Sequence, residues 1–162
     1  MGASLTENGV SSNVVASSGF SFVNITTVNT NVNAGSIALP SSGIWIVGYQ
    51  SRIGGRDMAI YLQCALSTST SSSDVFSTYR MLTERVENEG TSNLNIGQWS
   101  TWYIDVANGN TSGKTIYVNV GVSSGTTTAA FLQDDVNGQT GIIAWKIRES
   151  TTSGTGVSNV GI

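Results

Sequence analysis

The chain contains no histidine among its 162 residues. Histidine is the commonest general base near neutral pH and the commonest metal ligand in proteins. Its absence leaves paired carboxylates as the main remaining route to acid–base catalysis. We therefore expect a protein that is not an enzyme and that carries no cofactor.

Cysteine and charged residues are also scarce. Cys64 is the single cysteine, which excludes an internal disulfide framework. Lys, Arg, Asp and Glu make up 10% of the residues, and the net charge is −3, whereas soluble domains usually have about a quarter charged residues. Such a chain has no electrostatic footprint for nucleic acid, and it has no apolar stretch of transmembrane length. We expect neither nucleic acid nor a membrane as a partner.

Short runs of β-branched and aromatic residues, separated by clusters of Gly, Ser, Asn and Thr, fill the sequence instead. Helical spacing of apolar residues is nearly absent. The pattern predicts an all-β, antiparallel jelly-roll β-sandwich of eight to nine strands. The expected strands are residues 19–28, 36–39, 43–52, 57–66, 75–86, 98–106, 115–122, 128–132 and 141–148. Residues 90–97 fit either a short helical turn or a loop.

The two ends of the chain differ from its middle. Residues 1–18 and 150–162 are polar and rich in Gly, Ser and Thr. We interpret them as an N-terminal and a C-terminal arm on either side of a sandwich domain at residues 19–149. Each arm is expected to contact neighbouring subunits.

Alternation along three strands separates a core face from an outer face. The core faces are predicted to hold Met58, Ile60, Leu62, Cys64 and Leu66; Trp102, Ile104 and Val106; and Ile116, Val118, Val120 and Val122. Tyr61, Tyr103 and Tyr117 stand on the opposite faces, where solvent is expected. Three large aromatics in that position indicate an association surface, because each ring can pack while its hydroxyl finds a partner.

The stretch "LPSSGIWIVGYQ" (residues 39–50) adds to this expectation. Ile44, Ile46 and Gly48 share one face of a strand, and Trp45, Val47 and Tyr49 share the other. Only one set can belong to the core. The other set needs a second cover, such as an arm of the same chain or a neighbouring subunit.

Among the four tryptophans, Trp45, Trp102 and Trp145 are expected in the core, the last with Ile143 and Ile147. Trp99, at the start of its expected strand, is a candidate for exposure and for facing a ligand.

The acidic residues offer two weaker sites. Asp134, Asp135 and Asn137 carry the hard oxygen ligands that suit Ca²⁺, although a polar turn explains the same residues and is favoured. The cluster Glu84, Glu87 and Glu89 is better explained as a solvated strand end than as a glycosidase-like site.

Two segments carry a resemblance to a known family. Residues 30–54 ("TNVNAGSIALPSSGIWIVGYQSRIG") resemble the start of tumour-necrosis-factor-like and complement-globular-head-like jelly rolls, where Leu-Pro-x-x-Gly precedes an aromatic-aliphatic strand. Residues 127–150 ("TTAAFLQDDVNGQTGIIAWKIRES") are similar to the close of such domains. The disulfides of secreted members are absent here. Polar, weakly charged, cysteine-poor domains of this kind look like virion proteins of tailed phages.

The resemblance implies a homotrimer that pairs the outer face of one sheet around a threefold axis. The corresponding function is capsid decoration: a cement protein on the virion surface that binds the major capsid protein of a phage shell. A fibre or spike head that binds a host glycan is the alternative, and a carbohydrate-binding module is a third.

Overall fold

The protein is described by a computed structural model that covers residues 14–18, 23–24, 31–56, 59–70, 80–86, 94–126, 129–132 and 140–160. Side chains are described for residues 31–52, 64–70, 97–121 and 140–160. Within these ranges the chain forms strands and turns and no helix. The strands are β1 (Val14–Ser18), β2 (Val23–Asn24), β3 (Asn31–Leu39), β4 (Gly43–Arg56), β5 (Ala59–Ser67), β6 (Arg80–Val86), β7 (Leu94–Val106), β8 (Lys114–Thr126), β9 (Ala129–Leu132), β10 (Gly141–Arg148) and β11 (Val157–Asn159).

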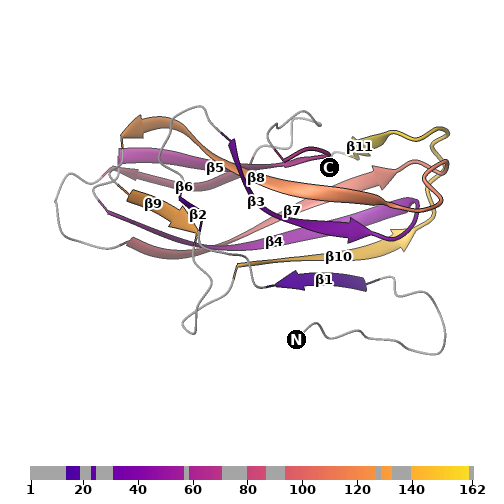
Figure 1. Cartoon of the computed structure of the whole chain (residues 1–162), viewed down its shortest axis with the longest axis horizontal. Coiled ribbons are helices and arrows are strands. Elements are labelled where there is room, and N and C mark those ends of the chain that lie inside the picture. Colours follow the sequence, from indigo (N-terminus) through magenta and orange to yellow (C-terminus); the bar gives the residue numbers. More distant parts are fainter. Residues whose placement is uncertain are drawn as a thin grey trace.

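The strands form two antiparallel sheets (Figure 1). The larger sheet has the order β1-β10-β4-β7-β11, with β9 and β2 attached to the far end of β4. The smaller sheet has the order β3-β8-β5-β6. The pairs β1·β10, β3·β8, β4·β7 and β5·β6 are nested along the chain. This nesting is that of a long hairpin rolled onto itself, so the predicted jelly-roll sandwich is confirmed.

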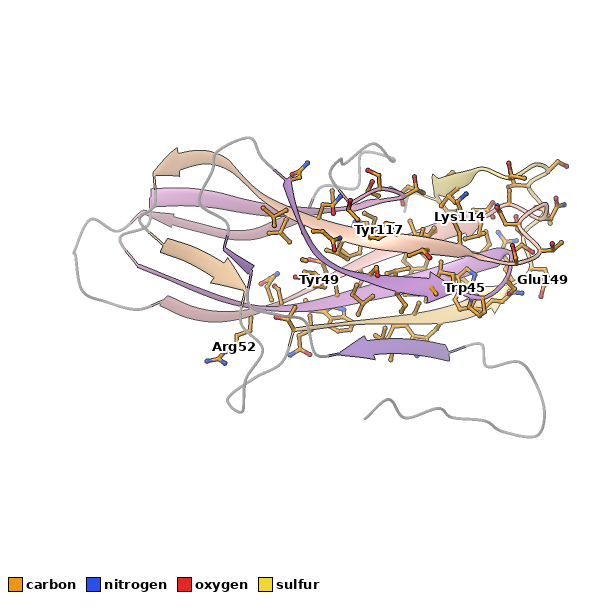
Figure 2. All side chains as sticks on the ribbon, in the orientation of Figure 1. Trp45, Tyr49, Arg52, Lys114, Tyr117 and Glu149 are labelled. Atoms are coloured by element: carbon orange, nitrogen blue, oxygen red, sulfur yellow. The ribbon has the colours of Figure 1, made fainter. Side chains whose placement is uncertain are left out.

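One core lies between the two sheets, and both contribute to it. The larger sheet supplies Trp45, Val47, Tyr49, Trp102, Ile104, Val106, Ile142 and Ala144; the smaller one supplies Ala34, Ile37, Leu39, Cys64, Leu66, Ile116, Val118 and Val120. The predicted core faces of β7 and β8 are confirmed at every described position, as is the burial of Cys64. Figure 2 labels Trp45 and Tyr49 along β4 in the interior of the sandwich.

Several strand bounds differ from the prediction. Residues 14–18, expected in the N-terminal arm, form β1 at the edge of the larger sheet, and residues 157–159, expected in the C-terminal arm, form β11 at its other edge. Residues 94–97, left open between helical turn and loop, continue β7. Of the strand expected at 19–28, the described part is β2. β1 and β11 are both short, so their sequences hold too few residues to show an alternating apolar pattern.

The assignment of Trp145 to the core is wrong. Ile142 and Ala144 face the core from β10, while Trp145 and Ile143 are only half-buried and Ile147 is 50% exposed. β10 lies between β1 and β4 and is apolar on both faces, so alternation alone does not decide which face is inside. The Trp145 side chain therefore lies on the outer face of the larger sheet.

Tyr49 is a polar group inside this core. Its side chain is fully buried, and its hydroxyl has no hydrogen-bond partner among the described residues. Burial, followed by the nearby Cys64, raises the pKa of the Tyr49 hydroxyl well above its ordinary value of 10.0. A neutral, unpartnered hydroxyl in an apolar interior destabilises the fold.

We expect Tyr49→Phe to stabilise the protein by about 1 kcal/mol, because it removes the unpartnered hydroxyl and keeps the ring. Urea unfolding near pH 7 measures this gain. The advantage should grow above pH 10, where the unfolded wild type releases the tyrosine proton and the folded state retains it, so the stability of the wild type falls by up to about 1.4 kcal/mol per pH unit from this group. A variant no more stable than the wild type at either pH would contradict the burial of an unpartnered hydroxyl.

Candidate functional site

The outer face of the larger sheet carries large apolar side chains in adjacent rows. Its central part, here called the aromatic face, is formed by Ile46, Gly48 and Gln50 of β4, Trp99, Thr101 and Tyr103 of β7, and Gly141, Ile143 and Trp145 of β10. These are the alternate residues to those in the core. The doubly apolar stretch at 44–49 is thereby explained: Trp45, Val47 and Tyr49 pack inside, and Ile46 contributes to the outer surface.

Strand register fixes the neighbours on the aromatic face. Ile46 is the cross-strand partner of both Tyr103 and Trp145, so one row reads aromatic, aliphatic, aromatic across three strands. All three side chains are half-buried. Directly opposed residues on one face of a sheet have Cβ atoms about 5 Å apart, so these side chains form a continuous strip. β1 is the next strand towards the sheet edge, and Val14 is the cross-strand partner of Trp145.

Trp99 completes the aromatic face. Its ring lies over Gly48, where a Cβ atom would collide with the ring, and its Nε1 donates a hydrogen bond to Thr101 Oγ1 at 2.8 Å. An aromatic ring laid over a glycine of the neighbouring strand is a stable sheet arrangement. The side chain remains 48% exposed, as predicted, so one part of the ring is fixed by the sheet and another is open.

Charge is confined to the ends of the aromatic face. None of its residues is ionisable at neutral pH, whereas Asp105 and Arg148 flank Ile44 beyond one end and Arg52 follows Gln50 at the other. An uncharged aromatic centre with charges at its margin is the residue distribution of protein–protein interfaces. The aromatic face therefore has the composition of an association surface.

The outer face of the smaller sheet has a different character. Ala65, Ser67 and Asn119 point outward from β5 and β8 and are nevertheless buried. Asn119 Nδ2 donates to the carbonyl of Ser69 at 3.0 Å, and Asn33 Nδ2 donates to Asn119 Oδ1 at 3.2 Å. This part of the smaller sheet is already covered by the chain itself and is organised by polar contacts.

The three tyrosines predicted to share one surface lie in different sheets. Tyr103 belongs to β7 of the larger sheet, whereas Tyr61 and Tyr117 belong to β5 and β8 of the smaller one. Tyr103 and Tyr117 are both half-buried. The idea that one sheet face carries all three is wrong, because alternation assigns faces within a strand and does not say which strands share a sheet. Ile46, Ile143 and Trp145 were not identified from the sequence as neighbours of Tyr103 on this face, although the double pattern at 44–49 pointed to Ile46.

The structure gives little support to the remaining candidate sites. Asp134, Asp135 and Asn137 lie outside the described residues. Within the described ranges there is no group of three His, Cys, Asp or Glu residues that could hold a metal ion. The same ranges contain no helix long and apolar enough to cross a membrane.

Comparisons with known proteins give structural likenesses only. No family model and no curated protein matches the chain. The crystal structure of the infectious bursal disease virus VP2 subviral particle aligns with a TM-score of 0.38 at 9% identity, over 89% of this chain and 38% of that one. The structure of the infectious bursal disease virus Gt strain aligns with a TM-score of 0.36 at 10% identity, over 89% and 39%. The chain spans about two fifths of those chains, and at these TM-scores neither likeness bears on function.

Proposed function

We propose that the chain is a virion structural protein: a homotrimeric capsid decoration protein on the surface of a phage shell. The aromatic face is the observation that supports this proposal. It offers an uncharged surface fixed on rigid strands, with Tyr103, Ile46 and Trp145 in one row. Such a surface favours burial against another protein, because its side chains gain little from water.

In this proposal the aromatic face is covered by a second copy of the chain. Closed ring symmetry lets identical aromatic faces be buried together without leaving an open end that would grow into a fibre. In the trimer each subunit contributes its own capsid contacts. Three linked weak contacts act at high effective concentration and hold neighbouring capsomers together. Scarce charge suits this role, because contacts made without ion pairs are insensitive to salt.

Imaging of the virus particles that carry the protein tests this proposal. Gold-labelled antibody against the chain should decorate the shell at many regularly spaced positions, with label removed when the protein is stripped. Label restricted to a few appendages would contradict decoration and favour a fibre head. Bound mass on isolated shells, measured with and without added protein, gives the copy number independently.

A fibre or spike head that binds a host glycan is the second candidate function. Trp99 favours it, because its ring is held over Gly48, its N–H is satisfied by Thr101, and its remaining surface is exposed. Sugar rings stack on aromatic rings held in this way, and the neighbouring Gln50, which is exposed, can hydrogen-bond hydroxyl groups.

If glycan binding is the function, Trp99→Ala should weaken binding to host-surface glycans at least about tenfold, which corresponds to about 1.4 kcal/mol. Ile147→Ala is the matched control, since Ile147 is equally exposed but offers no aromatic ring. Binding is measured by calorimetry or on immobilised host glycans. Equal losses in both variants, or none in either, would remove Trp99 from a glycan site.

A further inference from the structure

The segment at residues 150–160, here called the C-terminal strap, is attached to its own chain by a series of backbone hydrogen bonds, to which the Asn110 side chain adds a donor to the carbonyl of Gly156 at 3.4 Å. Amide groups of the turn after β7 donate to carbonyls of the strap: Ala107 to Gly156 at 3.0 Å, Asn108 to Thr152 at 2.9 Å and Gly109 to Gly154 at 2.8 Å. β11 then pairs with residues 104–106 of β7, and the amide of Val160 donates to the carbonyl of Tyr103 at 2.8 Å. The strap thus adds a strand and a loop to one edge of the larger sheet (Figure 1).

Side-chain anchors of the strap are few. Residues 151–156 are exposed throughout, and Val157 is the described strap residue that packs against the core. Gly154 adopts φ +97°, which allows the chain to reverse and present its carbonyl to Gly109. The strap therefore follows a defined path while burying little apolar surface.

Asp105 makes a further contact with the strap, and only one of its two carboxylate oxygens is hydrogen-bonded. Its carboxylate is buried beneath the strap, and Oδ2 accepts a hydrogen bond from Thr152 Oγ1. The other oxygen, Oδ1, is buried with no hydrogen-bond partner among the described residues. A buried, half-satisfied carboxylate regains its missing hydrogen bonds from water when the strap opens.

These contacts make the strap separable from the sandwich. Backbone hydrogen bonds contribute modestly to stability, because water satisfies the same groups in the open state, and ordering the strap costs conformational entropy. The core cluster is formed by residues of the two sheets, and Val157 is the described strap residue that packs against it. Segments with few apolar contacts open locally without global unfolding.

We propose that the edge formed by β7 residues 103–106 and the turn at 107–110 is a strand-acceptor site for the C-terminal strap of a second copy of the chain. The occupant is identified by the site itself, which already holds this segment in every backbone contact described above. Exchange between identical copies forms the same contacts again, so it has little thermodynamic cost. The inference rests on the proposed homo-oligomer, since exchange needs a neighbour within reach.

The reach of the strap limits how the two copies can be arranged. The first exchanged contact is at Thr152, so residues 149–151 bridge the end of β10 and the acceptor edge of the other copy. Three extended residues span at most about 10 Å. Exchange therefore requires that the β10 end of one subunit adjoins the β7 edge of the next. Exchange around a closed ring would link the subunits through the same contacts.

Disulfide trapping in the full-length protein tests the exchange. Ser158 is the cross-strand partner of Asp105. One preparation carries Ser158→Cys, and a second, isotopically labelled preparation carries Asp105→Cys. The two thiols face each other only when the strap of one copy lies on the edge of the other. Cys64 is fully buried and stays in place. The control mixes Asp105→Cys with Ala38→Cys, an exposed residue of the smaller sheet, and measures chance collision.

If the straps exchange, the mixture of Ser158→Cys with Asp105→Cys should give at least tenfold more disulfide between a labelled and an unlabelled chain than the control mixture. Equal yields overturn the inference, provided that both variants retain cooperative unfolding. Hydrogen exchange on the unmodified protein gives a second check: the amides of Ala107, Asn108 and Gly109 should exchange as one group, well before those of the β4·β7 ladder. Protection equal to that ladder also overturns it.

Light scattering on the same samples separates the two proposals. A stable trimer without mixed disulfide overturns strap exchange and leaves the proposed assembly standing. A stable monomer overturns the assembly and the exchange together.

Discussion

Tyr103→Ser is expected to convert the proposed trimer into monomers while leaving the sandwich folded. Tyr103 stands in one row of the aromatic face with Ile46, its neighbour on β4, and with Trp145 on β10 beyond it. Truncating an aromatic that is buried in an interface typically costs about 2 kcal/mol or more, which is about 30-fold in the dissociation constant of each contact. A closed trimer contains the contact three times, so the effect on assembly is larger than on any single pair.

The chain supplies its own matched control. Tyr117 is also a half-buried tyrosine on a strand, but it lies in the smaller sheet between Ser36 and Ser67. Tyr117→Ser removes the same group and should leave the mass unchanged. Light scattering across a dilution series measures the assembly, and far-ultraviolet circular dichroism checks that the sheets persist.

Two outcomes would contradict the assignment of the interface to the larger sheet. Loss of the trimer in Tyr117→Ser but not in Tyr103→Ser would move the interface to the smaller sheet. Unfolding of Tyr103→Ser at ordinary temperature would show that this ring stabilises the fold and not the assembly.

The architecture could be predicted from the sequence because its signals are local. Alternation in β7 and β8 identifies the core-facing residues, and Gly, Ser and Asn clusters mark the turns. Trp102, Ile104 and Val106 were placed correctly for this reason. Successive side chains of a strand point to opposite faces of its sheet, so the alternating pattern is present whichever strands pair with it.

Features that depend on strand pairing could not be predicted in the same way. Tyr103 and Tyr117 fit the same local rule, yet they lie in different sheets, because sheet membership is set by long-range pairing. Trp145 was misplaced since β10 is apolar on both faces. The C-terminal strap is held by backbone hydrogen bonds, which leave no side-chain pattern to detect.

β4 carries both core residues and residues of the aromatic face. Its residues alternate between the core, at Trp45, Val47 and Tyr49, and the aromatic face, at Ile46 and Gly48. Neighbouring positions should therefore control different measurable quantities. Substitutions on the inner set change the free energy of unfolding, whereas substitutions on the outer set affect association.

Trp45→Ala is expected to cost about 3–5 kcal/mol of unfolding free energy, the largest single effect on stability that we predict. The Trp45 side chain is fully buried between the sheets, and its Nε1 donates a hydrogen bond to the carbonyl of Ser41 at 3.2 Å, in the turn that precedes β4. Removing the ring leaves a cavity in the core and also releases that turn. Since a domain of this kind is stable by about 5–15 kcal/mol, the loss is a large part of the total.

Two further variants separate the contributions of Trp45. Trp45→Phe keeps most of the buried ring but removes the hydrogen bond to Ser41, so it should cost about 1–2 kcal/mol. Trp99→Ala removes an equally large side chain from the outer face and should cost the monomer about 1 kcal/mol, because the ring is half exposed and leaves no cavity in the core. Urea unfolding at concentrations where the chain is monomeric ranks the three. If Trp99→Ala proved as costly as Trp45→Ala, the two faces of the larger sheet would not differ in the way that their burial indicates, and the outer face would have to be treated as part of the folding core.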